Sequence, residues 1–280
     1  MLPTAVSEPR GMACETTDRM VRCLVLIGFT SLIAVLDASS SPAENAPRTE
    51  RKQAANAQQP LHIPFKVGER LTYHAKLNFI NAGTATMSVE GIEDIRGHPA
   101  YHTIFDVKGK ILFFHVDDHY ESWFDTTTLV SLRHIQHIDE SKYKADKTYD
   151  FYPERQVYVR NGQERPSVAE PLDEGSFVYF LRSVPLEVGK TYEFNRYYNA
   201  ERNPVIVKVD RRERIKVPAG EFDALVLKPI IKSKGLFSES GDAEVWLADD
   251  PSRTLLRLKS KLPFGTLYLE LKQIENVNRR

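Results

Sequence analysis

The residues most suited to chemistry lie in one short polar run that holds two histidines and several acids. If this run is a β-strand, His115, Asp117, His119 and Glu121 point to the same side of it. Imidazole and carboxylate groups are ligands of zinc and other divalent ions. Alternate residues of a straight strand lie about 7 Å apart, however, whereas Zn–N bonds are about 2 Å long. The spacing therefore favours a solvated polar strand face over the alternative of a metal site, and no metal or cofactor is predicted.

Two glutamates form a second candidate group, because each stands two residues before a tryptophan. Glu121 precedes Trp123 and Glu244 precedes Trp246, and the chain has no other tryptophan. A pair of carboxylates is the machinery of glycoside hydrolysis, so a catalytic acid pair is one interpretation. A glutamate beside a half-buried tryptophan more often pairs with Arg or Lys on a neighbouring strand. The sequence also lacks a G-x-S-x-G motif and a glycine-rich phosphate loop. No catalytic residue is assigned, and the protein is predicted not to be an enzyme.

Large aromatic side chains and their polar neighbours are the candidates for binding a ligand. The candidate ligand-binding residues are Glu121, Trp123, Phe177, Phe180, Glu244 and Trp246. Core packing is the alternative for each aromatic residue, because large apolar side chains are normally buried in any sheet protein.

The elements that must position these residues are mainly strands. Apolar and polar residues alternate at period two from about residue 65 to residue 275, as at Leu71, Tyr73 and Ala75. Turn residues such as Asn161-Gly162 separate the alternating runs. The spacing predicts roughly a dozen strands in antiparallel sheets.

One helix is predicted at about residues 174–183, between the two halves of this pattern. Asp173 and Ser176 have the types and the spacing of a helix N-terminus, and Pro185 follows the expected end. The run between them is rich in large apolar residues. Such a helix must bury these groups, and the junction of two sheets is the available place.

The second half of the sequence repeats the first at an offset of about 120 residues. The matching features are Val67-Gly68 with Val188-Gly189 (offset 121), Glu93-x-Ile95 with Glu213-x-Ile215 (offset 120) and Glu121-x-Trp123 with Glu244-x-Trp246 (offset 123). Three matches in order at nearly constant spacing indicate an internal duplication. The predicted fold class is all-β with one helix: two repeated, curled antiparallel sheets, or half-barrel-like units, with the helix at their junction.

The N-terminal region has the pattern of a secretory signal. Two arginines precede an apolar core of 13 residues, Leu24–Leu36, and Ser41-Pro42-Ala43 follows as a small-residue cleavage site. The core is shorter than the roughly 20 apolar residues that span a membrane. We therefore predict that residues 1–43 are removed near Ala43, that the protein is periplasmic, and that it is not an integral membrane protein.

The start of the chain and its cysteines bear on this assignment. Met12 and Met20 are alternative start positions, because the residues before Arg19 are atypical of a signal. Cys14 and Cys23 both precede the predicted cleavage site, so the mature chain is expected to contain no disulfide and no thiolate. Residues 44–62 are polar and rich in Ala, Gln and Asn, as is typical of a flexible tether.

The charge balance argues against a nucleic-acid partner. The chain has 38 Lys and Arg residues and 38 Asp and Glu residues, so it carries no basic excess. A nucleic-acid-binding module normally concentrates its basic residues in one patch, and only short runs such as Arg211-Arg212 are present. After residues 1–43 and the tether, a folded domain at about 63–275 remains, with repeats at about 65–160 and 186–275.

Several of these segments together resemble the bacterial exported family called domain of unknown function 3108. The segments that carry the resemblance are Phe65–Tyr73, Asp173–Arg182, Val217–Phe222, Glu244–Asp250 and Gly265. The resemblance covers about residues 63–275 and implies an exported, β-rich protein with no assigned activity. It brings no catalytic residue with it.

The fold expected from these patterns is similar to that of the periplasmic lipoprotein carrier and its outer-membrane acceptor, which hold acyl chains beneath helical lids. We therefore predict a non-enzymatic protein that binds a hydrophobic or amphiphilic envelope component, a lipid or lipoprotein, between its two halves. A pocket lined by aromatic and aliphatic side chains is expected beneath the helix. The alternative is an envelope assembly or scaffold protein that binds a protein partner and holds no small ligand.

Overall fold

The computed structural model gives the arrangement of most of the predicted β domain. The described residues are 61–111, 114–141, 143–231, 243–262 and 265–276. The predicted signal, both cysteines, the cleavage site and nearly all of the tether lie outside these residues. No helix in the described part of the chain is long and apolar enough to cross a membrane.

Among the described residues, fourteen strands form one antiparallel sheet. The first eight are β1 (Glu69–Leu77), β2 (Ile80–Ile95), β3 (His98–Ile111), β4 (Phe114–Asp125), β5 (Ser131–Glu140), β6 (Tyr143–Tyr152), β7 (Val157–Arg160) and β8 (Gln163–Pro166). The last six are β9 (Thr191–Phe194), β10 (Val205–Val217), β11 (Gly220–Ile230), β12 (Ala243–Ala248), β13 (Leu255–Leu262) and β14 (Gly265–Asn276). The helical elements in this part of the chain are the 3₁₀ turns η3 (Pro153–Arg155) and η4 (Ala200–Arg202) and the α-helix α2 (Glu174–Ser183).

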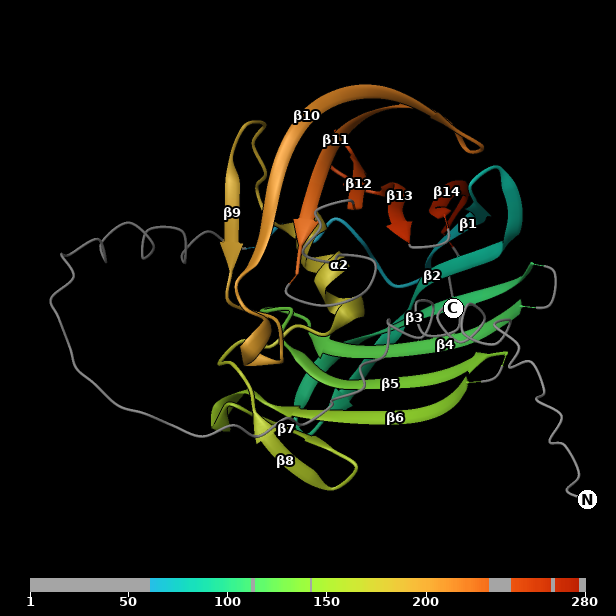
Figure 1. The fold of residues 1–280 in the computed structure, drawn as a ribbon. Coiled ribbons are helices and arrows are strands. Elements are labelled where there is room, and N and C mark those ends of the chain that lie inside the picture. Colours follow the sequence, from blue (N-terminus) through green and yellow to red (C-terminus); the bar gives the residue numbers. More distant parts are fainter. Residues whose placement is uncertain (1–60, 112–113, 142, 232–242, 263–264, 277–280) are drawn as a thin grey trace, which may run out of the picture.

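The strand order shows how the two halves are joined. It runs β8-β7-β6-β5-β4-β3-β2-β1-β14-β13-β12-β11-β10-β9, so the first strand of the sheet pairs with the last. The prediction of two sheets is corrected to one continuous sheet, because β1 and β14 satisfy each other's edge hydrogen bonds. The sheet does not close, since β8 and β9 form its two free edges. It curls around helix α2, as Figure 1 shows.

Each half of the sheet contains a six-stranded meander, β1–β6 and β9–β14, and the two share local features. Gly68 and Gly189 both have positive φ, at 88° and 84°. The amide of Gly68 donates to the carbonyl of Val89, and the amide of Gly189 donates to that of Val209, both at 2.8 Å. A β-bulge follows each acceptor, at Val89 and Val209, and a bulge of this kind increases the local bend of a strand.

Helix α2 begins and ends as the sequence predicts. The carboxylate of Asp173 accepts hydrogen bonds from the amides of Gly175 and Ser176. The hydroxyl oxygen of Ser176 in turn accepts a hydrogen bond from the amide of Asp173, and the two interactions form a capping box. The helix faces the concave side of the sheet. Its large side chains Phe177, Phe180 and Leu181 are buried there.

The main core lies between the helix and the concave face of the sheet. It includes Leu71 and Tyr73 of β1, Val205 and Val207 of β10, and the large apolar residues of α2. A second, small cluster on the other face contains Trp123, which packs with residues of β2, β3 and β5. The curl therefore divides the sheet into an enclosed concave face and a convex face.

Candidate functional site

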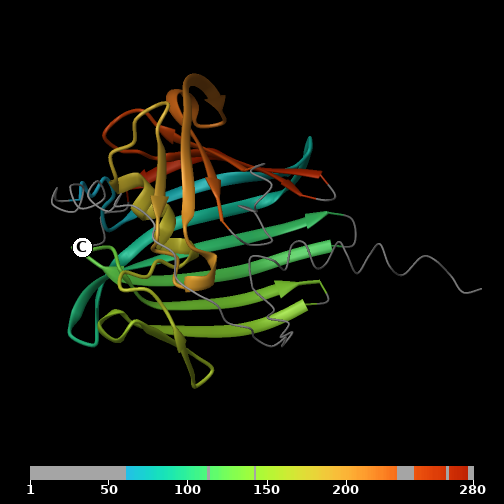
Figure 2. The ribbon, with the colours of Figure 1, turned by 60° about the vertical axis from the view of Figure 1, so that its left-hand side comes forward.

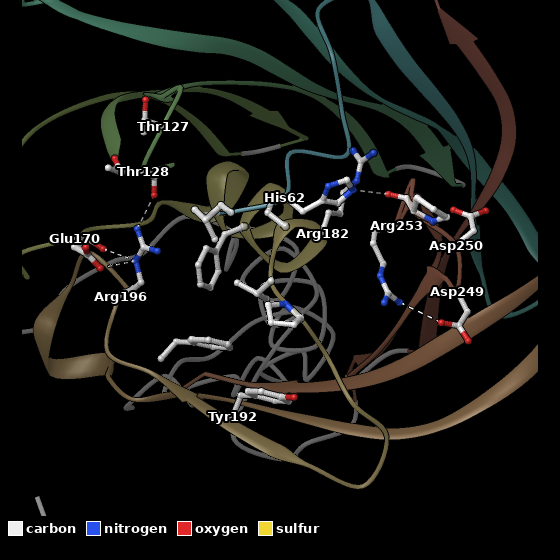
Figure 3. A pocket seen from close by; sticks show the side chains of 17 residues that line it. His62, Thr127, Thr128, Glu170, Arg182, Tyr192, Arg196, Asp249, Asp250 and Arg253 are labelled. Carbon is white, nitrogen blue, oxygen red and sulfur yellow. Dashed lines mark hydrogen bonds and ion pairs between the residues drawn. The ribbon is translucent and has the colours of Figure 1, made fainter. Parts of the chain in front are cut away.

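A hollow at the C-terminal end of α2 has a volume of about 920 Å³. Its walls come from the last turn of the helix, from β9, from the β4–β5 loop, from the β12–β13 loop and from residues 61–62 (Figure 3). A volume of this size is in the range of sites that bind small molecules. It adjoins the helix, as expected, although it lies at the helix end and its lining is of mixed polarity.

One wall of this pocket is aromatic. Phe180 of α2 meets Phe194 of β9 edge to face at 5.1 Å, and Tyr192 stacks on Phe194 at 6.2 Å. Val184 and Pro185 extend the apolar surface beyond the helix. The β9 side chains lie on this wall because alternate residues of a strand share a face.

The same wall carries a cation at its edge. The guanidinium of Arg196 lies 4.6 Å from the ring centroid of Phe180 and donates hydrogen bonds to the carbonyls of Glu170 and Thr128. The carboxylate of Glu170 lies 3.6 Å away. Burial lowers the pKa of Arg196 from its usual value, while Glu170 opposes this shift. Arg196 therefore places a largely desolvated positive charge beside apolar rings.

The opposite wall is polar. Figure 3 shows Arg253 and Asp249 facing Arg196 from the other side of the pocket. The side chains of Arg253 and Asp249 are 3.3 Å apart, and the carboxylate of Asp249 also accepts a hydrogen bond from the guanidinium of Arg212. His62 contacts the carbonyl of Pro251 in the same loop. This side offers both charges to a polar group of a ligand.

Between the walls, Arg182 has a structural role. Its two terminal nitrogens donate to the two carboxylate oxygens of Glu69 at 2.7 and 3.0 Å. Burial disfavours its charge, and the hydrogen bonds to Glu69 outweigh this effect and raise the pKa of Arg182. The guanidinium also stands over the rings of Phe65 and Tyr179. This ion pair ties the end of α2 to the start of β1.

Of the six candidate ligand-binding residues, Phe180 lines this pocket and the other five lie elsewhere. Glu121 and Trp123 lie on the opposite face of β4 from Ser122, whose hydroxyl donates to Asp173 at the start of the helix. The indole of Trp123 donates to Glu93 and stacks on His102. These residues therefore lie on the convex face. Phe177 is buried in the core.

The second glutamate–tryptophan pair has a similar arrangement. Trp246 donates to Glu213 at 2.5 Å. Glu244 contacts Lys259 of the neighbouring strand β13 and Arg211 of β10, which are partners of the predicted kind, whereas Glu121 contacts a histidine, His102. Burial opposes ionisation of Glu244, and the two cations outweigh it, so its pKa lies below the usual value. A glutamate whose pKa is lowered is poorly suited to donate a proton in catalysis.

The polar run on β4 contacts side chains of the two neighbouring strands, β3 and β5. His115 contacts Asp139, Asp117 contacts Lys108, and His119 contacts Asp106. In the part of the chain that the structure describes, no group of three or more His, Cys, Asp or Glu side chains is arranged to hold a metal ion.

A buried charged cluster on the concave face was missed by the sequence reading. Asp118 of β4, Glu140 of β5 and Lys147 of β6 are at most 4% exposed and face the side of the sheet that carries the helix. The hydroxyl of Tyr120 and the amide of Asp139 both donate to Asp118. The period-two alternation of the sequence could have predicted this cluster, because all three residues fall at inward-facing positions of their strands.

Burial controls the protonation of this cluster. Desolvation and the neighbouring carboxylate of Asp118 raise the pKa of Glu140 to about 9, so Glu140 is protonated at neutral pH and donates to Asp118. Desolvation, with a contribution from Arg160, lowers the pKa of Lys147 to about 8. Among the described residues, Gln136 Oε1, Glu140 Oε2 and Lys147 Nζ have no hydrogen-bond partner. Buried polar atoms of this kind are commonly bridged by ordered water.

A proton-sharing carboxyl pair also occurs in acid–base catalysis. Here, however, both carboxyl groups are about 1% exposed, so a substrate has no access to them in this conformation. The pocket beside α2 is therefore the better candidate for binding.

Comparison with known proteins gives one family. The family described as "Protein of unknown function (DUF3108)" matches residues 72–272. No curated protein matches the chain.

Three solved structures align with the chain at low identity and low TM-score. A β-barrel-like protein of domain of unknown function DUF1849 from Brucella abortus is 11% identical, with a TM-score of 0.48 over 76% of this chain and 99% of that chain. A candidate lipoprotein from Parabacteroides distasonis is 12% identical, with a TM-score of 0.31 over 77% and 98%. A candidate exported protein with a YmcC-like fold from Bacteroides fragilis is 10% identical, with a TM-score of 0.29 over 77% and 99%.

Proposed function

The chain belongs to the DUF3108 family of proteins of unknown function, and we propose that it is a non-enzymatic cell-envelope protein that binds an amphiphilic molecule beside helix α2. The observation that carries this proposal is the two-sided pocket of about 920 Å³. Its aromatic wall suits an alkyl chain or ring, and its charged wall suits a polar head group.

The charges of the lining support a ligand whose polar group is neutral or zwitterionic. The lining contains the cations Arg182, Arg196 and Arg253 and the acids Glu170, Asp249 and Asp250. These three cations and three acids are equal in number. A ligand with a large net charge would meet a like charge as well as an opposite one.

Filling the pocket tests the proposal. Val184→Trp adds an indole to the apolar wall without removing any charged group, and should lower the affinity for dodecylphosphocholine at least about tenfold. Val188→Trp is the matched control, because Val188 is exposed, lies four residues away and does not line the pocket. Binding is measured by isothermal titration below the micelle concentration.

Extraction of the purified protein with organic solvent identifies the natural ligand. A lipid that co-purifies with wild type and with Val188→Trp, and is depleted from Val184→Trp, supports binding. Equal binding by both variants would contradict the proposal. A ligand-free protein that crosslinks to a stable protein partner would favour the scaffold function.

We also infer that the domain arose by duplication of a six-stranded unit. The inference is supported by the same indole–carboxylate hydrogen bond in each half, Trp123 to Glu93 and Trp246 to Glu213. A β-bulge directly after each tryptophan supports it further. Superposition of residues 69–152 on 191–276 should align Trp123 with Trp246; unrelated positions would contradict a duplication.

Export to the periplasm and cleavage near Ala43 complete the proposal. They rest on the charged, apolar and small-residue series of residues 19–43. Intact-mass measurement of protein from the periplasmic fraction tests them. A recovered chain that still contains Cys23, or carries a lipid on it, would contradict cleavage at this position.

A further inference from the structure

The end of the β1–β2 hairpin presents two large apolar side chains to solvent. Phe79 is 98% exposed and Ile80 is 61% exposed, whereas the other phenylalanines whose surroundings are described are buried or partly buried. The two residues are adjacent in the chain and lie at the point where the hairpin turns. Together they form an exposed apolar tip of the hairpin.

This tip is held in place by the neighbouring strand. The amide of Asn78 donates to the carbonyl of Thr266 at 2.7 Å, and the amide of Thr266 donates to the side-chain oxygen of Asn78 at 2.9 Å. Asn78 has a φ of 54°, a left-handed conformation that asparagine tolerates. The exposed rings and methyls are therefore presented from a defined turn.

Unpaired positive charge lies at the same end of the sheet. Lys261 of β13 is directly opposite Thr266, the residue that binds Asn78. Lys110 lies one residue beyond Gly109, which pairs with Gly83 near the start of β2. Both lysines are exposed, and neither forms an ion pair with another described residue.

The acids near this end are already neutralised. Asp117 contacts Lys108 at 3.2 Å, and Glu270 contacts Lys76 at 2.6 Å. These acids therefore do not offset the positive charges of Lys110 and Lys261, and this end of the sheet keeps a positive excess from the two lysines. In Figure 2 the β1–β2 and β13–β14 ends lie together at one side of the sheet, away from the β2–β3 connection.

We propose that Phe79, Ile80, Lys110 and Lys261 form a docking rim that binds the surface of an anionic lipid bilayer. Apolar and aromatic side chains enter the interfacial region of a bilayer, while lysines are attracted to anionic head groups. A second copy of this chain fits the rim less well, because a symmetric contact would bring the lysines of both copies together. The rim does not contribute to the pocket beside α2.

A tryptophan at the tip reports contact with lipid directly. Phe79→Trp, in the full chain as processed by the producing cell, should shift its emission to the blue with vesicles of phosphatidylcholine and phosphatidylglycerol at 3:1. It should shift little with phosphatidylcholine alone. Native Trp123 and Trp246 are buried and change little. Ile92→Trp is the matched control, because Ile92 is 54% exposed at the other end of the same strand. An equal shift in both variants would contradict a docking rim.

Vesicle co-sedimentation separates the apolar contribution from the charged one. Phe79→Ser with Ile80→Ser should weaken binding to the anionic vesicles at least about tenfold. Lys110→Gln and Lys261→Gln should each weaken it about fivefold, and the double variant should abolish the preference for phosphatidylglycerol. Ile92→Ser should bind as wild type does.

Two results would overturn the proposal. One is undiminished vesicle binding by the Phe79→Ser, Ile80→Ser variant. The other is a wild-type oligomer that this variant converts to monomer in sedimentation velocity, which would make the rim a contact between copies. The pocket variant Val184→Trp should dock as wild type does, so failure of the pocket proposal and failure of the docking proposal are distinguishable.

Discussion

At the residue scale, Glu140 makes the stability of this protein depend on pH. Its pKa is about 9 in the folded protein, against an ordinary value of 4.5, so the folded state retains a proton that the unfolded state releases. The stabilising effect of this proton is complete below about pH 4.5 and is lost as pH rises towards 9. The free energy of unfolding should fall by up to about 1.4 kcal/mol per pH unit in that window through this group alone.

Replacing Glu140 by Gln removes this titration. We expect Glu140→Gln and wild type to be similar in stability near pH 4.5, and the variant to be more stable by several kcal/mol at pH 8. Urea unfolding between pH 5 and 8 measures the difference. Lys147 does not confuse the comparison, because its pKa of about 8 keeps it protonated in both states over most of this window. Parallel pH profiles for the two proteins would contradict a raised pKa at Glu140.

The ion pair of Arg182 and Glu69 gives a second prediction at this scale. Arg182→Met should reduce stability by about 3–5 kcal/mol, because it leaves the carboxylate of Glu69 buried without its partner. The double variant Arg182→Met, Glu69→Met removes both charges and should recover much of the loss. Thermal and urea unfolding of the two single variants and the double variant form a mutant cycle. Simple addition of the two single effects would contradict a coupled pair.

At the element scale, Asp173 joins helix α2 to the sheet. Its carboxylate accepts hydrogen bonds from two backbone amides of the first helical turn and from the hydroxyls of Ser122 on β4 and Ser131 on β5. The helix is therefore fixed at its start by a cap and at its last turn by Arg182. This explains how a ten-residue helix keeps a defined position inside an open sheet.

Removing that cap tests its role. Asp173→Ala should destabilise the protein by about 3 kcal/mol, because it removes the cap and leaves buried hydroxyls unpaired. Asp173→Asn keeps one side-chain oxygen and should have a smaller effect. Asn199→Ala, at the exposed start of the 3₁₀ turn η4, is the control and should cost well under 1 kcal/mol. Equal losses for the alanine variants at 173 and 199 would contradict a special role for this cap.

At the scale of the whole molecule, the pairing of β1 with β14 holds the two halves together. A cut between Ala169 and Glu170 places β1 on one fragment and β14 on the other, so each of these strands loses its partner. We expect neither fragment to fold alone, because each exposes a long strand edge and part of the shared core. When both are produced together they should form a one-to-one complex with the circular dichroism of the intact protein. Stable folding of either fragment alone would contradict this dependence.

Much of the local structure follows from the sequence alone, because it depends on the spacing of nearby residues. Period-two alternation identifies the strands and their inward faces, as at Leu71, Tyr73 and Ala75. The spacing of Asp173 and Ser176 identifies the start of the helix. A side chain's direction is set by its own backbone, so a few neighbours in the chain are sufficient to predict it.

Contacts between side chains that are far apart in the sequence were decided only by the tertiary structure. Glu69 and Arg182 are separated by 113 residues and meet because the helix crosses the sheet to reach β1. Asp118, Glu140 and Lys147 meet because β4, β5 and β6 are adjacent in the sheet, and the pocket forms where five separate segments converge. Strand order and register determine such contacts, and they depend on long-range hydrogen bonding and burial that no local spacing records.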